Sequence, residues 1–85
     1  MIIPTIHMNG TSREALIEQY SVAGNTVMSA MRAMDEASPN GRDYYVQGPG
    51  AIGDAQRQHD AQVAKLREVY DYLTLMVDTI DAAGR

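Results

Sequence analysis

The sequence predicts an all-α fold: an antiparallel two-helix hairpin with an extended N-terminal arm, oligomerising into a helical bundle. Two long stretches carry apolar residues at alternating spacings of four and three, which is typical of helices with one buried face. A thirteen-residue segment rich in glycine and proline, Ser38 to Gly50, separates them. Residues 1–10 are the expected arm, and residues 11–85 are the expected hairpin. No apolar run approaches the roughly 18 residues that a membrane-spanning helix needs.

Composition predicts a small domain that self-associates. A chain of 85 residues buries too little apolar surface to be more than marginally stable alone. It has no cysteine, so neither a disulfide nor a thiolate metal site can add stability. We therefore expect a homo-oligomer, a dimer or higher. The formal net charge of −4 argues against long nucleic acid as a partner. We expect no membrane partner, and the lack of cysteine fits a reducing cytoplasm.

The arm is expected to be extended, because Ile6 and Met8 alternate with polar residues. Asn9-Gly10 then marks a turn before the first helix. The start of the chain lacks the basic flank and long apolar core of a signal peptide.

The first helix is predicted over 12–38. Thr11 and Glu14 fit a capping box, in which each side chain accepts a backbone N–H bond at the helix start. Pro39 ends the helix, because the residue before proline avoids the helical region. Gly24 costs about 1 kcal/mol relative to alanine and is expected to let another backbone approach closely. The predicted apolar seam is Leu16, Tyr20, Ala23, Val27, Ala30, Met34 and Ala37.

A loop over 39–50 and a second helix over 51–82 complete the predicted hairpin. Pro49 suits a first turn, Asp54 suits the positive end of the helix dipole, and Gly84 follows the end of the helix. The predicted seam of this helix is Ile52, Ala55, His59, Gln62, Leu66, Val69, Leu73, Met76, Ile80 and Ala83.

Apolar residues beside the two seams predict a surface for a second hairpin. They are Met28 and Met31 on the first helix, and Tyr72 and Leu75 on the second. One hairpin cannot cover two wide apolar stripes, so a four-helix bundle built from a dimer is the minimal arrangement.

The loop carries residues that suggest a ligand. Tyr44 and Tyr45 offer flat rings on which a base can stack, and Arg42 offers a bidentate fork for phosphate. Asn40 and Gln47 carry amide groups that can contact a base edge or ribose hydroxyls. The start of the second helix follows directly and is suited to bind an anion.

The loop has an alternative interpretation as a structured connector. In that case its tyrosines pack over the open end of the bundle, and Arg42 pairs with Asp43 or Glu36. Two adjacent tyrosines do not readily both point inward, so at least one is expected to be exposed.

A second group of candidate ligand-binding residues surrounds the start of the first helix: His7, Asn9, Thr11 and Arg13. Their backbone and side-chain donors can hold an anion at the helix N-terminus, although an ordinary capping box explains the same residues. In one antiparallel hairpin this end lies far from the loop. The two groups can therefore form one site only across a subunit interface.

The remaining polar residues do not predict chemistry. His59 and Gln62 fall on the seam of the second helix, where polar residues often fix register. We expect a buried, hydrogen-bonded histidine there rather than a metal ligand, because His7 is the only other one. No serine–histidine–acid set is readable, and acids near the loop such as Asp54 and Asp60 match no metal motif. We expect no enzymatic activity, no metal and no cofactor.

Two stretches resemble the motifs of a family of small phage and prophage proteins. They are Ile6-His7-Met8-Asn9-Gly10-Thr11-Ser12, and Ala37-Ser38-Pro39-Asn40-Gly41-Arg42-Asp43-Tyr44-Tyr45 continued by Gln47-Gly48-Pro49-Gly50-Ala51. The resemblance covers nearly the whole chain. It implies a phage origin, and with it the cytoplasm of an infected bacterium.

In size and architecture the chain also resembles short helical-hairpin phage proteins that oligomerise and sequester cyclic nucleotide messengers of bacterial immunity. These are the anti-CBASS and anti-Thoeris sponges. The likeness assigns no binding residues, but it implies a counter-defence protein whose ligand is a small anionic nucleotide. The alternatives are a protein–protein interaction module, acting in the virion, in assembly or in host takeover, and a nucleotide-cleaving enzyme.

Overall fold

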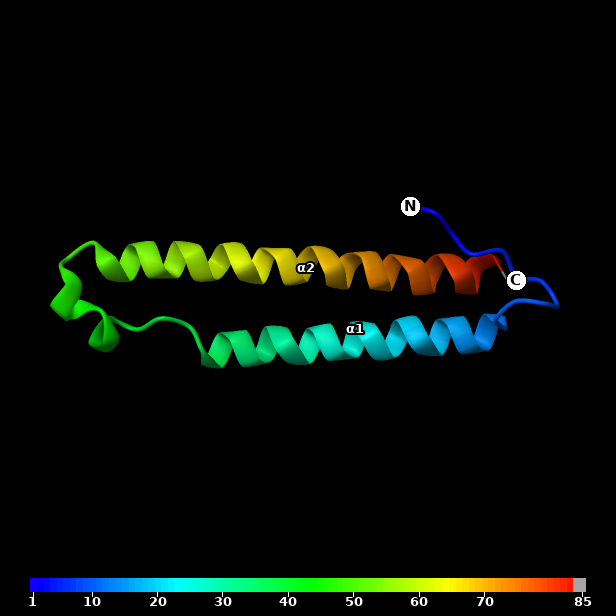
Figure 1. Cartoon of the computed structure of the whole chain (residues 1–85), viewed down its shortest axis with the longest axis horizontal. Coiled ribbons are helices and arrows are strands. Elements are labelled where there is room, and N and C mark those ends of the chain that lie inside the picture. The colour runs from blue at the N-terminus through cyan, green and yellow to red at the C-terminus, as the bar shows by residue number, and fades with distance from the viewer. Residues whose placement is uncertain (84–85) are drawn as a thin grey trace.

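The chain forms one antiparallel hairpin of two helices in the computed structural model (Figure 1). The structure describes residues 1–83. Helix α1 spans Arg13–Glu36, and helix α2 spans Ala51–Ala83. The two helices pack along a rod with extents of 62 × 19 × 19 Å, and no residue in the described range belongs to a β-strand. The predicted all-α hairpin is confirmed, whereas Gly84, predicted to follow the second helix, lies outside the described residues.

The start of α1 differs from the predicted capping box. Ser12 is the N-cap, and its hydroxyl oxygen accepts a bond from the backbone N–H of Ala15 at 3.2 Å. The prediction that Thr11 caps the helix together with Glu14 is wrong. Capping one residue later places an alanine at the third helical position, and Glu14 instead lies 3.6 Å from the guanidinium of Arg13.

The inner face of α1 includes most of the predicted seam but is rotated slightly to one side of it. Gly24 and Met31 are its buried residues, whereas Ala30 and Ala37 are exposed. The prediction that Met31 covers a second hairpin is wrong, because its side chain is 6% exposed within one chain. Burying methionine removes more apolar area from water than burying alanine, which favours this rotation.

Gly24 lies across from α2, but it is not needed for a close backbone approach. A Cβ atom added there would meet the Cβ of Leu73 at 3.8 Å, an ordinary van der Waals contact. Its predicted role in admitting another backbone is therefore wrong within this hairpin.

The inner face of α2 is apolar along its length but fully buried only in its second half. Leu73, Met76 and Ile80 are buried there. Gln62 is exposed and accepts a bond from Lys65, so its predicted place on the buried seam is wrong. An amide that stays in water avoids the cost of losing its hydrogen bonds.

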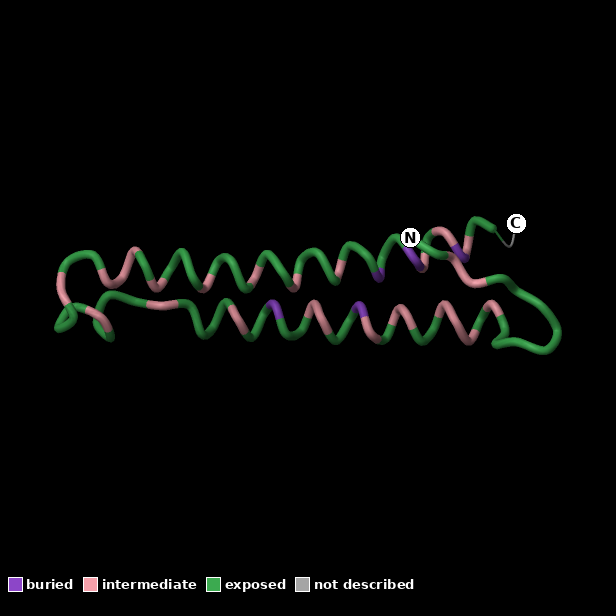
Figure 2. The backbone as a smooth tube through the Cα atoms, turned by 45° about the horizontal axis from the view of Figure 1, so that its top comes forward, coloured by how far each residue is buried: buried purple, intermediate pink, exposed green. Residues whose placement is uncertain are grey.

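The core is concentrated at the end of the rod where the arm lies (Figure 2). Met76 and Ile80 are 1% and 2% exposed, which two helices alone do not readily achieve. The arm runs alongside the last turns of α2 in both views, and its Ile3 and Pro4 are partly buried. The predicted turn is present, because the Gly10 N–H donates to the carbonyl of His7 at 3.1 Å.

Helix α2 continues past the end of α1 at the other end of the rod. It has 33 residues against 24 in α1, a difference of nine. The loop occupies the space beside its first turns (Figure 1). The connecting segment is long because it replaces the missing turns of α1.

Candidate functional site

The loop is built from two short 3₁₀ turns, η1 over Gly41–Asp43 and η2 over Tyr45–Gln47. Asn40 caps the first turn: its side-chain oxygen accepts a bond from the backbone N–H of Arg42 at 3.0 Å. Gly48 then takes φ of 110°, a conformation that favours glycine. The Asn40 cap and the Gly48 turn give the loop a defined shape. The Asn40 amide oxygen is already used inside the loop.

A shallow hollow of about 240 Å³ lies between the loop and the start of α2. Among its lining residues, Tyr44 and Gln47 come from the loop, and Asp54 comes from the first turn of α2. Asp54 forms an ion pair with Arg57. The carboxylate makes this hollow unfavourable for a phosphate, so it better suits the neutral part of a ligand.

Arg42 and Tyr45 do not line this hollow. Tyr45 is 76% exposed, and Arg42 is exposed as well. Within residues 1–83 the Arg42 guanidinium has no acidic partner, so the expected pairing with Asp43 or Glu36 is absent. The alternative that the loop is only a structured connector therefore fits Tyr44, which is half-buried, but not Arg42 and Tyr45.

The second candidate group lies at the opposite end of the rod (Figure 1). His7 and Asn9 belong to the arm, Thr11 lies between the arm and α1, and all three are exposed. The ring of His7 folds back over its own turn, since a Cβ atom added at Gly10 would lie 2.8 Å from its Nε2. The structure therefore does not bring the loop and arm candidates together within one chain.

Arg13 has a partner that the sequence did not indicate. Its Nη2 donates to the side chain of Asp81 at 2.8 Å and to the Asp81 carbonyl at 3.0 Å. The two side chains are 26% and 40% exposed. This pair ties the first residue of α1 to the last turns of α2, so a phosphate at Arg13 would compete with a carboxylate already in place.

His59 links α2 to the segment that follows α1. Its Nε2 lies 3.5 Å from the hydroxyl of Ser38, at the limit of hydrogen bonding, and the residue is half-buried. The prediction that His59 is buried is therefore wrong, because α1 ends at Glu36 and no helical turn of α1 covers this position.

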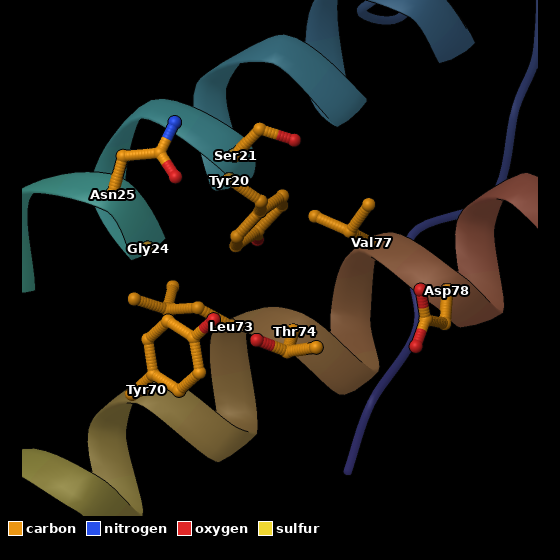
Figure 3. A pocket seen from close by; sticks show the side chains of 9 residues that line it. All are labelled: Tyr20, Ser21, Gly24, Asn25, Tyr70, Leu73, Thr74, Val77 and Asp78. Atoms are coloured by element: carbon orange, nitrogen blue, oxygen red, sulfur yellow. The ribbon is translucent and has the colours of Figure 1, made fainter. Parts of the chain in front are cut away.

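A groove that the sequence analysis missed lies between the helices (Figure 3). It has a volume of about 170 Å³, with Gly24 in its floor and tyrosine rings from both helices in its walls. The residues that line it are Tyr20, Ser21, Gly24, Asn25, Tyr70, Leu73, Thr74, Val77 and Asp78. The missing side chain of Gly24 was the one available signal.

The described part of the chain shows no metal-binding cluster, since residues 1–83 contain no group of three or more histidine, cysteine or acidic side chains placed to hold an ion. In the same range, neither helix has the length and apolar character needed to cross a membrane.

No protein family, curated protein or solved structure was found to match this chain. The site must therefore be judged from its own geometry.

Proposed function

We propose that this protein binds a small anionic nucleotide through its loop and does not transform it. The observation that carries the proposal is the pair of exposed, unpartnered groups on one ordered loop: the guanidinium of Arg42 and the ring of Tyr45. A free arginine suits phosphate, and an exposed tyrosine ring suits stacking on a base.

The rest of the loop supports contacts to the neutral part of the ligand. Tyr44 and Gln47 line the hollow beside Asp54, where an aromatic face and an amide can meet a sugar or base edge. Asn40 can still donate from its amide nitrogen while its oxygen caps the turn.

A second copy of the chain is needed to complete such a site. Arg42 and Tyr45 are exposed and do not line the hollow beside α2, whereas ligand sites are usually concave. His7, Asn9 and Thr11 of a neighbouring copy would supply the other wall, and Arg13 would join them only by leaving Asp81. The protein is thus a homo-oligomer in this proposal.

The biological form of this binding would be a sponge that sequesters an immune signalling nucleotide in an infected bacterium. The resemblance of the loop and arm motifs to small phage proteins supports this role. Sequestration requires binding alone, in keeping with the absence of a readable catalytic set.

Calorimetry and thermal shift against cyclic dinucleotides, cyclic trinucleotides and ADP-ribose derivatives test the proposal. We expect Arg42→Ala and Tyr45→Ala each to weaken binding by about tenfold or more. Lys65→Ala and Tyr72→Ala remove an exposed cation and an exposed tyrosine elsewhere, and should leave binding unchanged. The proposal fails if none of these nucleotides binds, or if binding survives loss of both Arg42 and Tyr45.

A protein partner is the second candidate, favoured by a different observation. Tyr45 and Val46 are neighbours in the loop and both are 76% exposed. Adjacent exposed apolar side chains of this kind mark protein contacts. A photo-crosslinking residue at position 46 during infection should then trap one defined protein, and Val46→Asp should abolish its binding while leaving any nucleotide affinity intact.

A further inference from the structure

The described core is too small to account for a stable fold of one chain. The buried hydrophobic side chains among residues 1–83 are Met31, Leu73, Met76 and Ile80, although 45% of the chain is hydrophobic. Chains of this size that lack disulfides and metals usually gain stability by association. A chain that is stable only in association needs a partner that is always present. A second copy of the same chain meets this requirement.

The face of the hairpin that holds the Gly24 groove carries an ordered arrangement of charge. On α1, Glu18 and Arg32 lie seven residues before and after Asn25, which lines the groove. Seven residues are two helical turns, so all three share one face and the charges lie about 10 Å on either side of the groove. Both charged residues are exposed, and neither has an ion-pair partner within the described range.

Helix α2 repeats this arrangement beside it. Arg67 lies seven residues before Thr74, and Asp78 lies four residues after it. Thr74 and Asp78 line the same groove, while the Arg67 guanidinium rests 5.9 Å from the ring centre of Tyr70. On both helices the acid therefore lies toward the arm and the base toward the loop.

The two arrangements have their centres at the same level of the rod. The centre on α1 is Asn25, and the centre on α2 falls between residues 72 and 73. Gly24 and Leu73 face each other across the hairpin, and both centres lie slightly toward the loop from that level, so they differ by about half a residue rise, less than about 1 Å. The outer charges of the face are thus self-complementary about one line that crosses both helices, whereas exposed Asp71, seven residues before Asp78, lies close to that line.

We infer that a second copy docks on this groove face, antiparallel, about a two-fold axis along that line. Glu18 then meets Arg32 of the second copy, and Arg67 meets its Asp78, with each contact made twice as in any isologous interface. A parallel arrangement would instead place Glu18 beside Asp78 and Arg32 beside Arg67. Like-charge contacts of that kind are unfavourable, so the charges select the antiparallel form.

The groove and its half-buried neighbour fit the same arrangement. Met28 lies one turn beyond Gly24 on α1 and is half-buried in one chain. The two-fold axis carries Met28 of the second copy to the level of residue 22, about one residue rise from Ser21 on the arm side of the groove. A flexible thioether side chain is suited to fill an irregular gap of this kind.

This dimer also bears on the loop site, although it does not depend on nucleotide binding. The axis passes near the middle of α1, which runs from Arg13 to Glu36. It therefore carries the end of one α1 to the start of the other. The segment from Ser38 to Arg42 would then lie beside the partner copy's Thr11 and Asn9. This contact would bring the loop candidates and the candidates at the start of α1 together.

Sedimentation equilibrium without any nucleotide tests the inference. We expect the wild-type chain to dimerise, and Glu18→Arg or Arg32→Glu each to raise the dimer dissociation constant by about tenfold or more. The double variant Glu18→Arg/Arg32→Glu should restore it to within about threefold. These positions are fourteen residues apart on one helix, about 21 Å, so a rescue can only act between chains. The double variant also keeps the wild-type composition, and circular dichroism verifies that each variant is folded.

Matched controls place the interface. Glu68→Arg makes the same charge change away from the groove face and should leave the dissociation constant unchanged. Asn25→Cys, near the axis, should form an intermolecular disulfide on mild oxidation, whereas Val22→Cys, 56% exposed on the outer side of α1, should not. A monomeric wild type, a double variant that is not rescued, or dissociation caused only by Leu75→Glu on another face would overturn the inference.

Discussion

Arg13 and Asp81 close the end of the hairpin that lies opposite the loop. The guanidinium serves a carboxylate and a backbone carbonyl at once. That carbonyl belongs to the last turns of α2, where helical carbonyls lack partners within the helix. One side chain thus fixes the position of α1 and satisfies the end of α2.

Replacing Arg13 by alanine should lower the free energy of unfolding by about 1–2 kcal/mol, because it leaves the Asp81 groups without this donor. Urea denaturation provides the measurement. Arg42→Ala is the matched control, since its guanidinium has no acidic partner in the described chain, and it should change stability by less than about 0.5 kcal/mol. Equal losses in the two variants would contradict the structural role of Arg13.

The sequence could not reveal this pair. Arg13 and Asp81 are 68 residues apart, and each sits among other charged residues on its own helix. Only the register of the hairpin decides which charges meet. The capping error has a similar origin: Thr11 and Ser12 are both good caps, and which one starts the helix depends on where the arm turns. The exposure of Tyr45, by contrast, could be predicted from the sequence, because two adjacent tyrosines do not readily both point inward.

At the level of elements, the loop depends on one glycine more than on the others. Gly48 adopts φ of 110° where η2 ends. Gly50, two residues later, has no such conformation and nothing near the position of a Cβ atom.

Gly48→Ala should therefore lower stability by about 1–2 kcal/mol, because an L side chain is strained in this region. Gly50→Ala should have an effect of less than about 0.5 kcal/mol. Thermal unfolding followed by circular dichroism compares the two. A larger loss from Gly50→Ala would mean that the loop does not hold the described turn.

Gly24→Ala should act in the opposite direction and raise the free energy of unfolding by about 1 kcal/mol, the helix preference of alanine over glycine. The added Cβ atom makes only an ordinary contact with Leu73. Ser29→Ala, at an exposed position of the same helix, measures how much a better helix former contributes alone. A destabilised Gly24→Ala would contradict this prediction for the single hairpin.

Helix type and approximate ends were readable from periodicity, from Pro39 and from the glycines around the loop. The face that each helix buries was less readable. On α1, most of the predicted seam is half-buried, but the buried residues Gly24 and Met31 each lie one residue beyond the seam positions 23 and 30. Both pairs are apolar, and partner packing chooses between them. On α2, Leu73, Met76 and Ile80 were placed correctly on the buried seam, and the apolar residues Tyr72 and Leu75, predicted to lie beside that seam, are exposed.

For the whole molecule, the uneven core predicts uneven local stability. Three buried residues of α2 lie between positions 73 and 80, beneath the arm. The first turns of α2 lie beside the loop instead, and Ile52 and Ala55 are only half-buried there.

Amide hydrogen exchange should therefore be about tenfold or more slower over residues 73–80 than over residues 52–59, because local opening costs less where little apolar surface is buried. Mass spectrometry of peptides from α2 gives both values from one sample. Uniform protection along α2 would contradict this picture for a single hairpin.

The capped turns of the loop have a consequence for the speed and thermodynamics of the nucleotide binding that we propose. Asn40 and Gly48 fix the backbone of the loop before anything is bound, so little conformational entropy remains to be lost. Association then requires no folding step, and affinity depends on the contacts of the tip itself. A ligand should leave the far-ultraviolet circular dichroism spectrum unchanged, and the rate of capture should rise linearly with ligand concentration.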